Sequence, residues 1–273
     1  MVIFEKCISF ASAMNARLIG SGTETLVLAH GYGGDQTVWD KVLPRLSRCC
    51  QVLVFDWTFS GAAKDKNIYD TNKYSTYEAF AADLICLMDE MNLKSSILVG
   101  HSMSGMIGCI ASIKRPDLFK RLFLVAASPR YLNAGDYEGG FSDAELEELL
   151  ATIENNFFTW TSVFPSMVMG ADDPSSVEKY RVSLESMRPE IAAAVARVVY
   201  FSDCRDILDY VDVPCVIIQT TNDLVVPNSV ANYMQKKIKN KAIVVTLDAV
   251  GHFPQLTVHE QFLDVLMGFC KVF

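Results

Sequence analysis

The chain has 273 residues, of which 51% are hydrophobic and 21% charged; this supplies a large core and excludes a disordered chain. A net charge of −8 argues against nucleic acid or an anionic membrane surface as a partner. The eight cysteines are scattered without a Cys-x-x-Cys pair, which favours a reducing compartment. The N-terminus lacks the basic start of a signal peptide, and no apolar run is long enough to span a membrane.

Short apolar runs alternate with helical patterns through the first half of the chain. The runs predict strands at 16–19, 25–28, 51–55, 97–99 and 122–125. Apolar spacing predicts helices around Val38–Leu43, over 77–91 and directly after residue 102. Continuously apolar strands that alternate with helices are typical of a parallel sheet covered on both faces.

The alternation stops between residues 131 and 206. Ser142 and Glu145 form a capping-box pattern, and Pro174 and Pro189 stand where helices begin, so about four helices are expected. Strands resume at 215–218 and 242–247, and a final helix carries Phe262. We therefore expect an α/β core of residues 1–130 and 207–273, with residues 131–206 inserted as a helical lid.

The chain is organised around Ile97–Ile107, which has the pattern of a strand, a sharp turn and a helix with Ser102 at the apex. A nucleophilic serine on such a turn needs small neighbours, and a helix N-terminus favours developing negative charge. The last glycine of the Gly-x-Ser-x-Gly pattern is replaced by Ser104. An ordinary turn with a capping serine explains this stretch equally well.

Two further residues complete a serine hydrolase pattern. Asp223 follows the strand at 215–218, and His252 follows the last strand. The order Ser102, Asp223, His252 is that of α/β-hydrolases, and each residue follows a separate predicted strand. Taken singly, Asp223 is typical of a turn residue and His252 of a structural histidine. The three residues together, in this order and each after its own strand, predict a catalytic triad.

The loop His30–Gly34 follows the second strand, where such folds supply an oxyanion-hole donor. We assign the backbone N–H groups of Tyr32 and Met103 to that role. The glycines of this loop also fit a tight turn. Because the third glycine of a dinucleotide fingerprint is missing and no P-loop or His-Glu-x-x-His motif occurs, we expect no cofactor and no metal.

Eight stretches match a known family: His30–Trp39, Gly100–Gly108, Arg115–Phe119, Ser128–Asn133, Tyr137–Phe141, Met187–Ile191, Ser202–Leu208 and Gly251–Leu256. With them, the chain resembles over nearly its full length the plant karrikin/strigolactone receptor family of α/β-hydrolases and the related bacterial stress-response hydrolase. The lid motifs are the more specific part, and in this family the Ser104 position is also not glycine.

The resemblance implies a V-shaped, four-helix lid over an apolar pocket. It implies butenolide ligands of the karrikin or strigolactone type and a receptor that cleaves them slowly. It also implies signalling through an F-box protein to a repressor, in the cytoplasm and nucleus. The resemblance also places a set of residues around the ligand; for each of them, the alternative is that it only packs the lid. These residues are Tyr32, Tyr131, Leu149, Trp160, Phe164, Tyr200, Leu224 and Val225.

Two features depart from the family. The segment Asp56–Gly61 stands where the family has an Asn-Met-Gly-Ala-Gly type of loop, and the first dozen residues extend past the usual start. Gly251 and Gln255 resemble the karrikin-type branch more closely, while the overall divergence indicates an early-diverging land-plant paralogue. Three functions stay open: a ligand-sensing serine hydrolase, an ordinary carboxylesterase of small apolar esters, and a binding module that keeps the triad without using it.

Overall fold

A seven-stranded sheet forms the centre of the computed structural model, which describes residues 9–65, 67–170 and 173–270. The strand order is β1-β3-β2-β4-β5-β6-β7; β1 pairs antiparallel with β3, and the other pairs are parallel. The mostly parallel sheet and its flanking helices confirm the predicted fold class. The strands are β1 (Arg17–Ile19), β2 (Thr25–Ala29), β3 (Gln51–Val54), β4 (Ser96–His101), β5 (Phe119–Val125), β6 (Cys215–Asn222) and β7 (Ala242–Val250).

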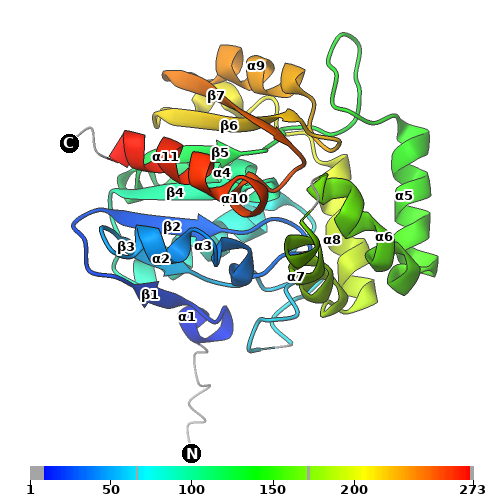
Figure 1. Ribbon diagram of the computed structural model, residues 1–273, viewed down its shortest axis with the longest axis horizontal. Helices are drawn as coiled ribbons and strands as arrows, with labels where there is room; N and C mark the ends of the chain where they lie inside the picture. The colour runs from blue at the N-terminus through cyan, green and yellow to red at the C-terminus, as the bar shows by residue number, and fades with distance from the viewer. Residues whose placement is uncertain (1–8, 66, 171–172, 271–273) are drawn as a thin grey trace, which may run out of the picture.

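Helices cover both faces of this sheet (Figure 1). In the view of Figure 1, α10 and α11 lie in front of the sheet, and α4 lies behind it, packed against α3. Every residue of β4 is buried, as expected for a strand covered on both sides. The helices outside the lid are α1 (Phe10–Ala13), α2 (Leu43–Leu46), α3 (Tyr77–Glu90), α4 (Met103–Lys114), α9 (Asn228–Lys237), α10 (Pro254–Thr257) and α11 (His259–Cys270), with 3₁₀ turns η1 (Gln36–Trp39), η2 (Pro116–Leu118) and η3 (Leu208–Tyr210).

Four helices connect β5 to β6 and stand beyond the carboxyl ends of the strands, on the right in Figure 1. They are α5 (Asp143–Asn155), α6 (Phe157–Met169), α7 (Pro174–Glu185) and α8 (Pro189–Phe201). The expected capping box starts α5: Ser142 Oγ accepts from the N–H of Glu145, whose carboxylate accepts from the N–H of Ser142 at 2.8 Å. We refer to α5–α8 as the lid; its exact division from the core at 131 and 206 stays a prediction.

The expected helix at Val38–Leu43 is wrong in detail. The structure has the 3₁₀ turn η1 and then the four-residue helix α2 instead. Pro44 explains the break: it stands in the first turn of α2, and without an N–H it cannot donate to the carbonyl of Asp40, as a helix continuing from η1 would require. The first eight residues of the N-terminal extension lie outside the described residues.

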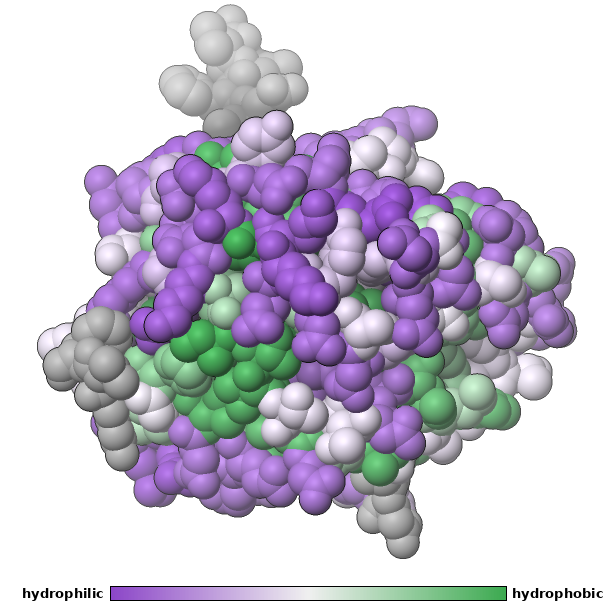
Figure 2. All heavy atoms as spheres, turned by 90° about the horizontal axis from the view of Figure 1, so that it is seen from above, coloured by the Kyte–Doolittle hydropathy of each residue, from purple (hydrophilic) through white to green (hydrophobic). Residues whose placement is uncertain are grey.

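The surface is mainly hydrophilic, with a hydrophobic area in the left half of Figure 2, over the edge of the sheet. Strand β7 forms this edge, and its residues 242–245 are only partly buried. Among the described residues, no helix is long and apolar enough to cross a membrane.

Candidate active site

Ser102 stands at the junction of β4 and α4 in a backbone conformation that few non-glycine residues adopt, with φ 55° and ψ −124°. Its N–H donates to the carbonyl of Val125 at 2.8 Å. The turn requires glycine at position 100, because a Cβ there would lie 2.6 Å from the carbonyl oxygen of Ser104. The small residues around the apex therefore permit the close passage of strand and helix that the sequence predicted.

Ser104, which interrupts the Gly-x-Ser-x-Gly pattern, is fully buried and hydrogen-bonded. Its hydroxyl donates to the carbonyl of His30 and accepts from Trp57 Nε1 at 2.9 Å. Trp57 belongs to the segment Asp56–Gly61, which departs from the family pattern. Ser104 is thus in contact with the segment that departs from the family, and this contact connects the turn at Ser102 to the loop that carries His30.

His252 and Asp223 form a hydrogen-bonded pair at the carboxyl ends of β6 and β7. His252 Nδ1 lies 2.8 Å from Asp223 Oδ2, and both side chains are buried. Asp223 Oδ1 accepts from the N–H of Val225 at 2.8 Å, and Oδ2 also accepts from Gln219 at 3.3 Å. Because an ionised carboxylate only accepts hydrogen bonds, this contact places the proton on Nδ1 of the histidine and leaves Nε2 for another partner.

The hydroxyl of Ser102 lines the same small cavity as His252. Its oxygen lies 3.3 Å from the hydroxyl of Tyr131, and in the described part of the chain no hydrogen bond joins it to His252. Hydrogen bonds between catalytic groups are often long before a ligand binds. The Ser102 hydroxyl and the imidazole of His252 must therefore come closer before the proton can pass between them.

Tyr32 and Met103, the expected oxyanion-hole donors, flank Ser102. Met103 is the first residue of α4, where the N–H has no acceptor within the helix. Tyr32 follows Gly31, which packs directly on the turn: a Cβ at Gly31 would lie 2.9 Å from Ser102 Cβ. The loop after β2 thus comes close enough to Ser102 for an N–H group to serve it.

Two buried histidines outside the predicted triad hold these loops. His30 Nδ1 donates to the carbonyl of Gly31 at 2.8 Å, and its Nε2 accepts from the N–H of Trp57. His101 Nε2 donates to the carbonyl of His252 at 2.9 Å. Burial lowers the pKa of both imidazoles, so both remain neutral and structural near pH 7. His259, the fourth histidine, begins α11, half-buried and away from the inner cavity.

The expected ligand residues divide between two hollows. The inner cavity at Ser102 has a volume of about 20 Å³, room for about one water molecule. The outer groove, between α5 and α6, has about 500 Å³, within the range of ligand pockets. The inner cavity is lined by Tyr32 and Tyr131, the outer groove by Leu149, Trp160 and Leu224, and both by Phe164, Tyr200 and Val225.

Sequence reasoning missed several lining residues. Tyr180, Val199 and Phe253 line the inner cavity, and Val168 lies where the two hollows meet. Val168 stands one helical turn after Phe164 on α6, and Phe253 directly follows His252, so spacing could have found these two. Nothing in the pattern of α7 singles out Tyr180, because its place at the cavity depends on how the lid packs.

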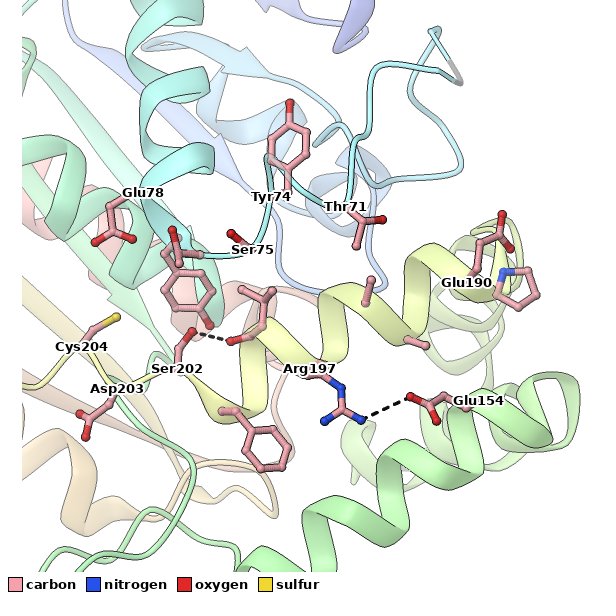
Figure 3. A pocket seen from close by; sticks show the side chains of 17 residues that line it. Thr71, Tyr74, Ser75, Glu78, Glu154, Glu190, Arg197, Ser202, Asp203 and Cys204 are labelled. Carbon is pink, nitrogen blue, oxygen red and sulfur yellow. Dashed lines mark hydrogen bonds and ion pairs between the residues drawn. The ribbon is translucent and has the colours of Figure 1, made fainter.

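A larger hollow of about 1110 Å³ lies between residues 71–78 and α8 (Figure 3). Figure 3 shows Arg197 turned toward Glu154, at 3.4 Å, along its rim. It shares no lining residue with the inner cavity or the outer groove. Since it contains neither Ser102 nor His252, its size does not make it the active site. Among the described residues, no cluster of histidine, cysteine and carboxylate side chains could hold a metal ion.

A strained serine turn on a parallel sheet, beside a buried histidine–carboxylate pair, defines the class of α/β-hydrolases. The sequence profile described as "alpha/beta hydrolase fold" matches residues 24–257, so the chain belongs to this family. A hydrolase from Oleispira antarctica has a similar structure, with a TM-score of 0.93 at 30% identity over 97% of both chains.

Two curated relatives narrow the assignment within this family. The chain is 42% identical to the strigolactone esterase RMS3 of Pisum sativum, over 90% of this chain and 92% of the relative. It is also 42% identical to the karrikin insensitive 2 receptor CA of Petunia hybrida, over 93% and 94%. The chain therefore belongs with the strigolactone esterases and karrikin-insensitive receptors and is a serine hydrolase, which confirms the resemblance. Equal identity to both relatives does not favour either branch.

Proposed function

We propose that this protein is a receptor for a small apolar butenolide, of the karrikin or strigolactone type, which it hydrolyses slowly with Ser102, His252 and Asp223. The observation that carries the proposal is the His252–Asp223 pair at a cavity shared with Ser102, joined to an apolar groove. Relatives named as a strigolactone esterase and as a karrikin receptor support both halves of it.

The chemistry follows from the geometry. Asp223 holds the imidazole of His252, so that Nε2 can take the proton of Ser102 as its oxygen attacks the ester or lactone carbonyl. The N–H groups of Tyr32 and Met103 stabilise the resulting oxyanion. His252 then gives the proton to the departing enol, and water releases the fragment bound to Ser102.

The two hollows indicate how a ligand is received. An inner cavity of about 20 Å³ cannot hold a lactone ring, whereas the outer groove of about 500 Å³ can. Phe164, Tyr200 and Val225 line both hollows. Movement of these side chains would open the inner cavity, so entry of the ligand is coupled to a rearrangement of α6 and α8.

Signal transfer is the second part of the proposal. A receptor needs a surface that changes with its ligand, and the lid that lines the groove is the part of the molecule best placed to change. We propose an F-box protein as the partner and a repressor as its target, in the cytoplasm and nucleus, on the basis of the family resemblance.

Intact-protein mass spectrometry during reaction with a strigolactone-like butenolide tests this function. The wild type, Ser102→Ala and Ser112→Ala are compared; Ser112 is a buried serine of α4 that donates to the carbonyl of Cys109, away from the site. We expect a lasting mass increase with nearly single turnover for the wild type and Ser112→Ala, and neither for Ser102→Ala.

Other outcomes identify the other functions. Fast, repeated turnover without a retained adduct indicates an ordinary carboxylesterase. Binding without product or adduct in the wild type indicates a module that does not use the triad. Cleavage retained in Ser102→Ala would refute the assigned nucleophile.

A further inference from the structure

The backbone around Tyr32 is held from two sides, and the first is the core. The carbonyl of Gly31 accepts from His30 Nδ1 at 2.8 Å and from the N–H of Gly34 at 3.2 Å. A peptide unit is planar, so holding this carbonyl also fixes the direction of the N–H of Tyr32. The core alone thus sets one of the two peptide planes that meet at Tyr32.

The lid holds the second plane. The hydroxyl of Tyr180, on α7, donates to the carbonyl of Tyr32 at 3.2 Å. The hydroxyl of Tyr32 in turn donates to the carbonyl of Ala192, on α8, at 3.0 Å. Gly33 has φ 70°, and a Cβ there would lie 2.5 Å from Leu184 Cδ1 and 2.9 Å from the Tyr180 hydroxyl. Helix α7 therefore packs directly on the loop that carries Tyr32.

Tyr180 also faces the cavity in which a ligand reacts. Its ring lies 4.5 Å from that of Phe253, next to His252, and 6.5 Å from that of Phe164, measured between ring centres. It is 2% exposed and lines the inner cavity. Any ligand that reaches Ser102 must therefore come close to this ring.

We propose that Tyr180 is a positioning residue of the oxyanion hole: by holding the carbonyl of Tyr32, it fixes the second peptide plane at Tyr32 and so keeps the Tyr32 N–H, whose direction the core sets, in place beside Ser102 while lid helix α7 is seated. This inference rests on the function proposed above. When α7 is displaced, the carbonyl of Tyr32 loses its lid partner, and the loop is held only by His30 and Gly34. The oxyanion hole is then complete only while the lid is seated, which ties turnover to the lid conformation.

The hydroxyl of Tyr180 can donate its hydrogen bond to the Tyr32 carbonyl throughout the pH range in which the enzyme would be assayed. Burial raises its pKa well above the ordinary value, so it remains a neutral phenol and a hydrogen-bond donor. The fall in kcat caused by removing this hydroxyl should therefore be the same from pH 6 to pH 9. The loss of a group that titrates in that range would instead change with pH.

The test compares Tyr180→Phe with Tyr77→Phe. Each substitution removes one buried hydroxyl; that of Tyr77 has no hydrogen-bond partner among the described residues and lies outside the inner cavity. With p-nitrophenyl acetate, we expect kcat of Tyr180→Phe to fall about tenfold with KM nearly unchanged, less than the loss of a whole oxyanion donor. Phenylboronic acid, which forms a tetrahedral anion on a reactive serine, should bind about tenfold more weakly. Tyr77→Phe should match the wild type in both.

The two hypotheses fail in different ways. If wild-type turnover depends on Ser102, but Tyr180→Phe equals Tyr77→Phe in kcat and boronate affinity, the role of Tyr180 is wrong and the proposed function stands. If the wild type shows no turnover that depends on Ser102, both are wrong. Thermal unfolding of both variants separates folding from positioning: Tyr180→Phe that loses activity only in proportion to its folded fraction also overturns the inference.

Discussion

The sheet and the lid hold the same site in different ways. Ser102, Asp223 and His252 each follow a strand whose backbone is paired with its neighbours, and the pair His252–Asp223 is itself hydrogen-bonded. The lid reaches the site through few hydrogen bonds: those of Tyr32 with Tyr180 and Ala192, and that from the N–H of His252 to the carbonyl of Val168 at 2.8 Å. A dense backbone network thus fixes the chemistry, while a sparse one governs access, as expected where part of a structure opens at low cost.

The largest effect should come from the part fixed by the sheet. In Asp223→Asn the amide can donate to Nδ1 of His252, which favours the wrong tautomer for a base acting through Nε2. We expect kcat to fall by about 10³–10⁴ with little loss of stability. Asp248→Asn, at an exposed position of β7, is the control and should keep wild-type kcat. Measured kcat within tenfold of the wild type for Asp223→Asn would remove Asp223 from the mechanism.

A smaller effect is expected where the lid touches the catalytic loop. Gly251 has φ 101°, and a Cβ there would lie 1.9 Å from the carbonyl oxygen of Met169, at the end of α6. Gly251→Ala must therefore displace either α6 or the backbone next to His252. We expect a loss of about 2–4 kcal/mol in the free energy of unfolding and a fall in kcat of about tenfold.

Gly135→Ala is the matched control for this substitution. Gly135 also has a positive φ, 60°, but a Cβ there would meet nothing within 4 Å. It should lose only about 1–2 kcal/mol, the cost of a left-handed alanine, and keep its kcat. Urea unfolding and steady-state kinetics measure both variants. Equal kcat in the two would mean that contact with α6 does not position His252.

The smallest expected effect is a pH dependence of the folding stability that comes from a histidine in the core. His101 is buried, and burial lowers its pKa well below the ordinary value of 6.5. Below pH 6.5 the unfolded chain takes up a proton that the folded chain does not, so stability is full above this pH and falls as the pH decreases. Each such histidine contributes a slope of about 1 kcal/mol per pH unit.

Urea unfolding between pH 7.5 and pH 5 measures this slope. His101→Gln should unfold more easily than the wild type at pH 7.5 but show a shallower dependence on pH. Identical slopes for the two proteins would show that His101 does not contribute to the pH dependence of stability.

The sequence identified most elements that local patterning controls. The strands 25–28, 97–99 and 215–218 were expected from continuous apolar runs, and the structure extends each by one to four residues. The helix starts at Ser142, Pro174 and Pro189 were expected from caps and proline, which act within one helical turn. The helix expected around Val38–Leu43 is divided into η1 and α2 because Pro44 has no N–H to continue the hydrogen-bond pattern.

The same distinction between local pattern and long-range packing applies to the active site. The sequence alone determined the α/β-hydrolase fold and singled out Ser102, Asp223 and His252, because each follows a strand and the carboxyl ends of parallel strands meet at one edge of a sheet. Only the tertiary structure decided that the inner cavity is nearly filled, that Ser104 contacts Trp57, and that Tyr180 holds Tyr32. The contact of Ser104 with Trp57 joins residues 47 positions apart, and that of Tyr180 with Tyr32 joins residues 148 positions apart. Side-chain packing at that separation depends on where whole helices settle, which no local pattern of residues encodes.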